Sequence, residues 1–465
     1  MEKANIESYD YIMAVLDKAE NGKVIDGKVW DKEYIGQRVK GLISKYDIKW
    51  NPEILVPSDN DLADRLFDAA MELALESGVY CINSSRQMKW SKDELAGAVS
   101  RAPSDLVVGQ GRDSVTLHSR QPEANQRVVV IGGAYGILIS EDLYGLMVEA
   151  YAREKILDII ETPSLPTTRG MPIRIGSPLE AIVARQEADI VLAAIKRAGR
   201  PGVCVAAAET SGTEIIELAA TSFGAFRQTD WHHASLISEN KVSYADLTRA
   251  VHFAQTGSIV HTFCDPIYGG YLGGAAGTAI GCTAGCILQR ATLFSDTVNA
   301  GPSHAHLALD THPDMLALQG LSFQALARNT KLINGAHIRP ASGPCEKDIF
   351  YEVAALVITA VTSGVSFLKT VQSATGRHMG HATPLEARFA AQVAHQVEGM
   401  TRNEGNKIVI SLANKYRERI SIETIGKSFQ EAYDMETLQP TAEWLKIYED
   451  VCAEFASEFG IRLDV

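Results

Sequence analysis

Short apolar runs alternate with longer helical stretches from about residue 126 onward. Eight runs rich in β-branched residues lie at 127–133, 157–164, 202–211, 225–231, 258–266, 291–299, 331–340 and 365–373. The segments between them, such as SPLEAIVARQEADIVLAAIKRAG, carry apolar residues at helical spacing. This alternation predicts an α/β protein with a parallel sheet. Eight repeats favour a closed (β/α)8 TIM barrel over an open doubly wound sheet, which is the alternative.

The chain before residue 126 lacks this alternation and shows helical patterns instead. The segment LADRLFDAAMELALESG has apolar residues at helical spacing and ends at Gly78, and SKDELAGAVSRAP begins at a capping Ser91. The stretch KSFQEAYDMETLQPTAEWLKIYEDVCAEF near the C-terminus also looks helical. We therefore expect an N-terminal helical extension at 1–125, a barrel catalytic core at 126–405 and a C-terminal helical segment at 406–465 packed on the barrel.

Composition and charge narrow the class of protein. Apolar residues make up 46% of the chain and charged residues 22%, as in an ordinary globular protein. The net charge of -13 argues against nucleic-acid binding, because contact with phosphates needs a basic face. The seven cysteines are an odd number without a CxxC pair. We therefore expect reduced thiols and a cytoplasmic protein rather than a disulfide framework.

Two segments bear on secretion and membranes. The N-terminal MEKANIESYDYIMAVLDKAE has no basic segment followed by an apolar run, so we expect no signal peptide. The uncharged stretch from Pro266 to Gln289 is long enough to cross a bilayer, which takes about 20 residues. Because Gly, Ala and Thr dominate it rather than Leu, Ile and Phe, we expect a tightly packed helix of a soluble protein and no membrane partner.

Polar residues gather where the predicted strands end, which is where active sites form in a barrel of this kind. Histidine recurs among them, although the whole chain has only twelve. The candidates for one polar cavity are Glu209 after the third strand, His232 and His233 after the fourth, Asp265 after the fifth, His304 and His306 after the sixth, His337 and Arg339 after the seventh, and Arg377, His378 and His381 after the eighth.

Each candidate also has a structural interpretation. In an extended chain His232 and His233 face opposite sides, so one of them is expected to be structural. Glu209 could orient a substrate cation or cap the helix that follows it. Arg339 could hold a substrate carboxylate in a bidentate contact or form a salt bridge at the barrel end. The residues alone leave these alternatives open.

Metal and nucleotide sites find less support. His304 and His306 are two positions apart and would share one face of a strand, which suits metal ligation. No spacing fixes a third ligand, so we expect no metal, with these two histidines as ligands if one binds. No GxGxxG with a following acidic residue comes after the first predicted strand, and no GxxxxGK[ST] occurs, so the usual phosphate cradles are missing.

A glycine-rich segment, PIYGGYLGG at 266–274, directly follows the fifth predicted strand. Glycine lets a backbone or a ligand approach closely. The segment could be a simple strand-to-helix turn, or it could contact a flat, bulky macrocycle.

Several blocks of the sequence resemble, in the same order, segments of the monomethylamine methyltransferases. The resemblance extends from about residue 45 to the C-terminus. The blocks are GQGRD (109–113), ISED (139–142), AGRPG (198–202) followed by VCV and ETS (209–211), PIYGGYLGG (266–274), SGPC (342–345), LEAR (385–388) and KSFQEAYD (427–434). The resemblance implies a (β/α)8 barrel, a homo-oligomer and transfer of a methyl group from a small substrate to a cognate corrinoid protein.

The pocket positions depart from the family pattern. By this resemblance, Ala206 occupies the place of the family's pyrrolysine, and His233 and Phe263 replace two acidic residues. His337 replaces a glutamine and Arg339 a tyrosine. His304 matches a family histidine, whereas His306 stands in place of an arginine. The resemblance therefore implies a rebuilt cavity on a retained scaffold.

This pattern suggests the chemistry. A Co(I) corrinoid attacks a methyl group in line, so the protein must position the methyl and provide a tolerable leaving group. A quaternary ammonium or a sulfonium leaves as a neutral molecule and needs no pyrrolysine. Available rings are those of Tyr268, Tyr271, Phe263 and Trp231, but they do not form an obvious cation cage. The histidines and Arg339 suit a polar or anionic substrate end instead, or acid catalysis on the leaving group.

We therefore expect transfer of a methyl group from a small N-methyl substrate, a quaternary ammonium compound that can bear a carboxylate, or from an S-methyl substrate. The acceptor is a corrinoid (cobalamin) that a partner protein carries, and the reaction proceeds without pyrrolysine. The expected roles are catalysis by His233, His337 and Glu209, substrate contact by Arg339, Asp265, His232, His304, His306, Phe263 and Ala206, and contact with the corrinoid by Gly269, Gly270, Tyr271, Gly273 and Gly274. The alternatives are a histidine-ligated metal-dependent hydrolase or lyase, and an inactive homologue that only binds the corrinoid protein.

Overall fold

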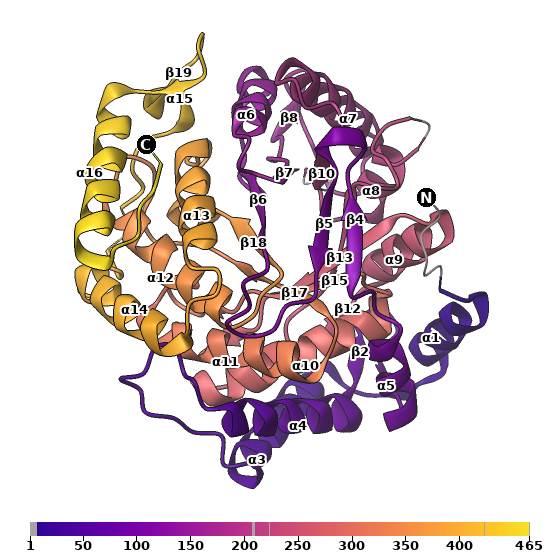
Figure 1. Cartoon of the computed structure of the whole chain (residues 1–465). Coiled ribbons are helices and arrows are strands. Elements are labelled where there is room, and N and C mark those ends of the chain that lie inside the picture. Colours follow the sequence, from indigo (N-terminus) through magenta and orange to yellow (C-terminus); the bar gives the residue numbers. More distant parts are fainter. Residues whose placement is uncertain (1–6, 207–209, 223, 423, 465) are drawn as a thin grey trace.

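Eight parallel strands close into a barrel at the centre of the molecule (Figure 1). The computed structural model describes residues 7–206, 210–222, 224–422 and 424–464. The barrel strands, in order around the barrel, are β6 (Val129–Gly133), β7 (Ile159–Glu161), β10 (Cys204–Ala206), β11 (Trp231–Leu236), β13 (Ile259–Cys264), β15 (Thr297–Ala300), β17 (Ile333–His337) and β18 (Phe367–Thr370). Strand β18 pairs with β6 and closes the ring, so the predicted TIM barrel is confirmed.

Two of the predicted strand positions were wrong. The run 225–231 is a loop in which the Arg227 backbone N–H donates to the Asp230 carboxylate at 2.7 Å, and the strand begins only at Trp231. His232 and His233 therefore lie within β11 rather than after it. The run 291–299 starts inside a helix, and β15 begins at Thr297. An apolar run alone does not distinguish a buried helix end from a strand.

Helices follow the strands and surround the barrel. They are α6 (Glu141–Arg153), α7 (Leu179–Arg197), α8 (Glu214–Ala220), α9 (Tyr244–Thr256), α10 (Ala275–Leu293), α11 (Pro313–Asn329), α12 (Asp348–Thr362) and α13 (Pro384–Gln396). The uncharged stretch forms α10, which is buried from Gly277 to Leu293 because N-terminal helices cover its outer side. Within the described ranges, no helix is both long enough and apolar enough to cross a membrane.

The N-terminal region contains helices and also short strands that the sequence pattern did not predict. The helices are α1 (Tyr9–Asn21), α2 (Gly27–Val29), the π-helix η1 (Trp30–Gln37), α3 (Arg38–Lys45), α4 (Asn60–Ser77) and α5 (Lys92–Ser100). Strands β1 (Lys23–Val24), β2 (Val79–Cys81) and β3 (Arg86–Met88) form a sheet with β12 (Lys241–Val242). This sheet ties the extension to the barrel loop that follows β11.

A hairpin of β4 (Asp105–Val108) and β5 (Val115–His118) closes the amino-terminal end of the barrel. Its Val108 and Leu117 pack against the apolar interior side chains at this end of the barrel. The Gln110 backbone N–H donates to the carbonyl of Gly202 at 2.7 Å, just before β10 begins. This end of the barrel is therefore filled, and chemistry is left to the opposite end.

The C-terminal elements pack against α12 and α13 on one side of the barrel (Figure 1). They are α14 (Arg402–Tyr416), α15 (Phe429–Ala432), β19 (Tyr433–Asp434), β20 (Gln439–Pro440) and α16 (Ala442–Phe459). Phe350 of α12 stacks on Trp444 of α16 with ring centroids 4.9 Å apart. The remaining short elements are η2 (Gly111–Asp113), β8 (Thr167–Thr168), β9 (Met171–Pro172), β14 (Ile267–Tyr268), β16 (Ser303–His304) and η3 (Ala374–Gly376).

Candidate active site

Strand alternation decides which side chains enter the barrel, because every second residue of a strand points to the same face. In β11 the inward residues include Trp231 and His233, and in β18 they include Phe367 and Lys369. Near the hairpin the interior is apolar, with the rings of Trp231 and Phe367 4.9 Å apart. One step further toward the carboxyl ends the interior becomes polar. The barrel strands therefore position His233 and Lys369 on the inward face of this polar end.

The first polar cluster centres on a buried ion pair. The Lys369 Nζ lies 2.8 Å from Oε1 of Glu161 at the end of β7, and both side chains are almost fully buried, with 5% and 0% exposure. The His233 Nε2 lies 3.7 Å from the same oxygen. The ammonium also faces the rings of Tyr135 and Phe263, 4.7 Å and 5.3 Å from their centroids. A buried ion pair compensates the desolvation of each charge only while both partners are present.

Two histidines beside this ion pair are held neutral. Burial lowers the pKa of His233 and of His261 well below the usual range, and the nearby Lys369 charge lowers both further. The His261 Nδ1 lies 2.9 Å from the Thr297 hydroxyl, which also accepts from the Trp231 indole N–H at 2.8 Å. A neutral imidazole can both donate and accept a hydrogen bond, so both rings can orient a polar substrate group.

The second polar cluster joins His337 and Arg339 to acidic partners. The His337 Nδ1 lies 3.3 Å from Oδ2 of the buried Asp310, and burial raises the pKa of Asp310 to about 7. Burial lowers the pKa of His337 well below its usual range, and the charge of Arg339 lowers this pKa further. The ring fits only because residue 301 is glycine, since a Cβ there would lie 2.8 Å from the Cβ of His337.

The Arg339 guanidinium is engaged on every nitrogen. Its Nε donates to Gln372 at 2.6 Å, its Nη1 to Ser303 at 3.3 Å, and its Nη2 lies 3.2 Å from both Asp265 Oδ2 and His337 Nδ1. The arrangement matches the salt-bridge alternative for Arg339. Direct contact with a substrate stays a prediction for this residue and for Asp265.

His232 does not lie where the sequence suggested. Its ring points out of the barrel and stacks on Phe253 of α9 with centroids 5.1 Å apart. Its Nε2 lies 2.9 Å from the carbonyl of Arg227, and Glu217 lies beside it. The expected substrate position of His232 is therefore corrected. The rule that neighbouring strand residues face opposite sides correctly predicted that one of the two histidines is structural.

The sixth loop does not form the expected strand-like histidine pair. The chain turns at His304, whose Nδ1 accepts from the backbone N–H groups of His306 and Leu307 at 3.3 Å. The ring of His304 lies 5.3 Å from that of Tyr268 and 5.4 Å from that of His312. Among the residues that the structure describes, no group of three or more His, Cys, Asp or Glu side chains is arranged to hold a metal ion.

The glycine-rich segment forms a tight turn between β14 and α10. Gly269 and Gly273 have φ values of 88° and 76°, which favour glycine, and Gly273 donates to the Gly270 carbonyl at 3.0 Å. Tyr271 at its tip is 54% exposed. Apart from its chain neighbours, a Cβ on Gly273 or Gly274 would meet no atom of the described residues within 4 Å, so the space beside these two glycines is open.

Ala206 ends β10 and belongs to the interior cluster, next to Trp231 and Glu161 in the strand register. Glu209 lies outside the described residues. At the eighth loop the Arg377 guanidinium donates to the carbonyl of Leu307 at 2.9 Å, and the rings of His378 and His381 lie 5.8 Å apart.

Sequence reasoning missed several residues of the polar interior. They are Tyr135, Glu161, His261, Asn299 and Lys369. For two of them a signal existed, because Glu161 in LDIIETPS and Lys369 in VSFLKTVQS are ionisable residues inside otherwise apolar strands. Such residues are almost never buried without a partner.

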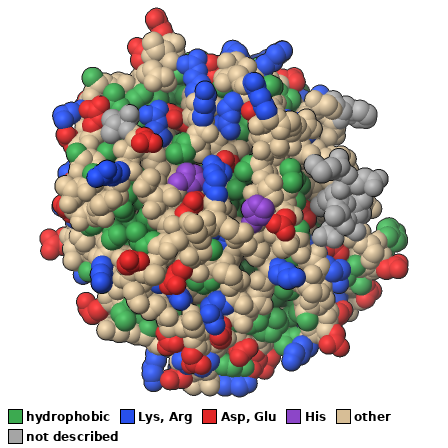
Figure 2. Space-filling view, viewed as in Figure 1, with side chains coloured by type: hydrophobic (Ala, Val, Ile, Leu, Met, Phe, Trp, Pro, Cys, Tyr) green, Lys and Arg blue, Asp and Glu red, His purple; other side chains and the backbone are tan. Residues whose placement is uncertain are grey.

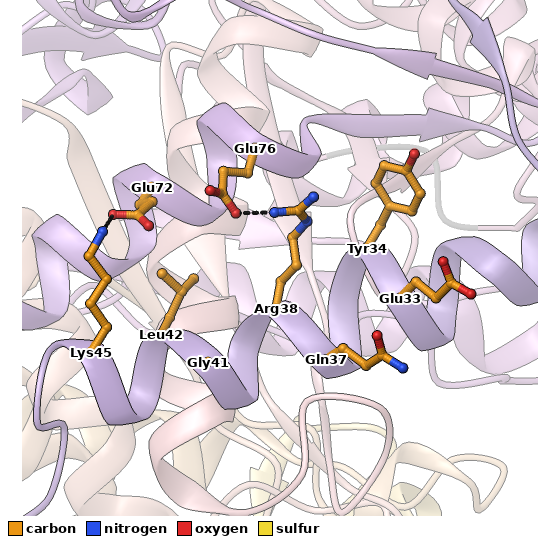
Figure 3. Close-up of a pocket in the computed structure, with 9 residues that line it drawn as sticks. All are labelled: Glu33, Tyr34, Gln37, Arg38, Gly41, Leu42, Lys45, Glu72 and Glu76. Carbon is orange, nitrogen blue, oxygen red and sulfur yellow. Dashed lines mark hydrogen bonds and ion pairs between the residues drawn. The ribbon is translucent and has the colours of Figure 1, made fainter.

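A groove of about 550 Å³ lies elsewhere, between η1, α3 and α4 of the N-terminal region (Figure 3). Arg38 pairs with Glu76 across it and Lys45 with Glu72. Four of its five charged side chains are thus paired, with Glu33 as the fifth, and the groove is a surface feature distinct from the barrel interior. On the face shown in Figure 2, acidic and basic side chains are interspersed over the surface.

The fold and the polar interior define a (β/α)8-barrel protein whose candidate site lies at the carboxyl ends of the strands, where enzymes of this fold place their active sites. A family model described as "Monomethylamine methyltransferase MtmB" matches residues 10–461. The chain belongs to this family.

Relatives and solved structures agree along nearly the whole chain. The chain is 31% identical to monomethylamine methyltransferase MtmB2 of Methanosarcina acetivorans over 451 residues, which is 96% of each protein. It is 30% identical to MtmB1 of Methanosarcina barkeri over the same length and coverage. The crystal structure of the Methanosarcina barkeri enzyme superposes with a TM-score of 0.94 at 30% identity, covering 97% of this chain and 98% of that one. A hydroxylamine complex of MtmB gives the same values.

Proposed function

We propose that this protein transfers a methyl group from a small N-methyl or S-methyl donor to a Co(I) corrinoid carried by a cognate partner protein. The observation that carries the proposal is the family match over residues 10–461, on a barrel whose polar interior lies at the carboxyl ends of the strands. We also expect the protein to be a cytoplasmic homo-oligomer.

The donor is proposed to be a quaternary ammonium or sulfonium compound. The side chain of Ala206 carries no reactive group, so the chain is proposed to work without pyrrolysine. When a methyl group leaves such a cation, the bond electrons stay on nitrogen or sulfur and the product is neutral. The transfer therefore needs no proton at the leaving atom, in agreement with histidines that burial holds neutral.

The chain itself supplies binding, orientation and a dry interior. The partner's Co(I) corrinoid would supply a strong nucleophile. The apolar cluster that includes Trp231 fills the end of the barrel near the β4–β5 hairpin. His233 and His337 are buried at the opposite, polar end. The open space beside Gly273 and Gly274 fits the face of a flat macrocycle, because, apart from the chain neighbours, no atom of the described residues lies within 4 Å of a Cβ built at either position.

The test is cobalamin spectroscopy. The purified protein, its cognate corrinoid protein reduced to the Co(I) state and one donor at a time are mixed, and the spectrum is followed for formation of methylcobalamin. Betaines, sulfonium compounds and methylamines form the panel, and an omission of the protein is the control. We expect conversion with at least one quaternary or sulfonium donor. A folded protein that converts no donor of the panel would contradict the proposal and leave the inactive homologue as the alternative.

The metal-dependent hydrolase alternative has no comparable support. Among the described residues no group of three or more side chains that includes His304 or His306 is arranged to hold a metal ion, and the His304 Nδ1 already accepts from two backbone N–H groups.

A further inference from the structure

The surroundings of the Lys369 ammonium match those of a bound substrate cation. Two aromatic faces, of Tyr135 and Phe263, and one carboxylate, of Glu161, surround it. Aromatic faces and a carboxylate are the groups with which proteins recognise small ammonium ions. The interior of this barrel therefore carries its own cation at the position that a free ammonium ion would otherwise favour.

The strands build this arrangement rigidly. Lys369 is opposite Ile131 in the register of β18 and β6, and Glu161 is opposite Gly133 in that of β6 and β7. The lysine side chain thus reaches over β6 to its carboxylate. A Cβ at Gly133 would lie 2.1 Å from the Glu161 carbonyl oxygen, so the glycine permits the close approach of β6 and β7.

Charge makes this interior unfavourable for a second simple cation near Lys369. The Lys369 ammonium already neutralises the Glu161 carboxylate, so a second cation would find no unpaired negative charge there and would be repelled by the ammonium where water is excluded. An anionic group can bind near Lys369, because the ammonium has three N–H donors and its ion pair with Glu161 uses one of them. Arg339 offers less, since every nitrogen of its guanidinium already has a partner.

The amide of Asn299 is a further polar group of the interior, and it has no hydrogen-bond partner among the described residues. Asn299 on β15 is 1% exposed, and it shares the inward face with Thr297, which contacts Trp231 and His261. Neither its side-chain nitrogen nor its oxygen has a hydrogen-bond partner among the described residues. It adjoins Phe263 in the strand register. A buried amide without partners is costly, and a polar ligand group would satisfy it.

We propose that Lys369 is a specificity-determining residue: its ammonium takes the place of a substrate cation, excludes small ammonium ions and selects methyl donors that direct a carboxylate toward Lys369 and Asn299. The selection of methyl donors rests on the proposed function. The exclusion of small cations depends on the site alone and is tested by binding.

The binding test uses methylammonium chloride as the probe. In Lys369→Ala the probe should fill the space beside Glu161 and the two rings, and it should raise the melting temperature of the variant by several degrees more than that of the wild type. Potassium chloride at the same concentration controls for ionic strength. Adding Glu161→Gln to the variant should abolish the shift. Equal stabilisation of the wild type, or a shift that persists in the double variant, would overturn the exclusion.

A second variant covers the case in which Lys369→Ala does not fold. Lys369→Met combined with Glu161→Gln removes both charges and keeps the volume of both side chains. The activity of this variant and of the wild type is measured with glycine betaine, which has a carboxylate, and with choline, which has none. We expect kcat/KM for glycine betaine to fall about ten- to a hundredfold through KM, as for loss of one charged hydrogen bond. The value for choline should change by much less.

The outcomes separate the two proposals. Equal loss for both donors would contradict the selection of a carboxylate, whereas methyl transfer as such would stand. A wild type that converts neither these donors nor any other of the panel would contradict the proposed function. The methylammonium binding result would then still decide whether Lys369 excludes small cations.

Discussion

The two halves of the barrel interior are built by the same eight strands and differ in chemistry. The lower half, near the β4–β5 hairpin, is apolar and includes Trp231, Ile259 and Phe367. The upper half, at the carboxyl ends of the strands, holds charged and polar side chains, among them the ion pair of Glu161 and Lys369. One or two residues along a strand separate the two. The lower half stabilises the fold through packing, whereas the upper half keeps costly buried charges, which is expected where a protein has a function to perform.

The lower half should respond to any loss of volume. Phe367→Ala removes a fully buried ring beside Trp231, and we expect a loss of about 3–5 kcal/mol in the free energy of unfolding. Chemical denaturation measures it, and Phe367→Leu should cost clearly less. A loss below about 1 kcal/mol for Phe367→Ala would mean that the lower half is not packed as described.

The upper half should instead respond to charge balance. Lys369→Met leaves the Glu161 carboxylate buried without its cation, and we expect destabilisation of about 3–5 kcal/mol. The double variant Lys369→Met, Glu161→Gln should recover most of this loss, because it removes the unpaired charge. The loss of volume in Phe367→Ala has no such compensating substitution. If the single and the double variant unfold at the same denaturant concentration, the ion pair is not the organising contact of the upper half.

A glycine in the lower half tests the tightness of the packing. A Cβ on Gly335 would lie 2.0 Å from the ring of Phe367, so Gly335→Ala should cost about 1–3 kcal/mol. The same substitution in a Phe367→Leu background should cost less, because the clashing ring is gone. Equal costs in the two backgrounds would contradict the contact between Gly335 and Phe367.

The upper half should also carry a pH dependence that the lower half lacks. The pKa of Asp310 is raised from 3.8 to about 7, so its protonated form stabilises the fold at low pH and this contribution is lost as the pH rises through about 7. At about 1.4 kcal/mol per pKa unit, the stability of the wild type relative to Asp310→Asn should fall by on the order of 1 kcal/mol between pH 6 and pH 8. Denaturation curves at both pH values measure the difference. A difference that is constant with pH would contradict the raised pKa.

The same comparison shows what a sequence can reveal. Six of the eight barrel strands were predictable from apolar runs rich in β-branched residues, whereas the runs 225–231 and 291–299 misplaced the other two. The strands of the N-terminal region were not, because each has only two to four residues, some of them polar, such as Arg86–Met88. His233 was a candidate after the fourth predicted strand, and alternation predicted only that one of His232 and His233 is structural, whereas the structure shows which of the two points inward.

The pairing in the upper half could not be predicted in the same way. Glu161 and Lys369 belong to strands far apart in the sequence, and they meet only because closure of the barrel places β6 between β7 and β18. Sequence spacing also misplaced the pair His304 and His306, since a turn that depends on tertiary hydrogen bonds replaced the expected strand.

The central claim is that this barrel moves a methyl group onto a corrinoid, and isotopic labelling tests it most directly. Glycine betaine with deuterated N-methyl groups is incubated with the protein and its cognate corrinoid protein in the Co(I) state, and the cobalamin product is analysed by mass spectrometry. The account predicts methylcobalamin that carries the intact deuterated methyl group, formed together with dimethylglycine in equal amount. Unmethylated cobalamin after complete incubation, or methylcobalamin without deuterium, would contradict it.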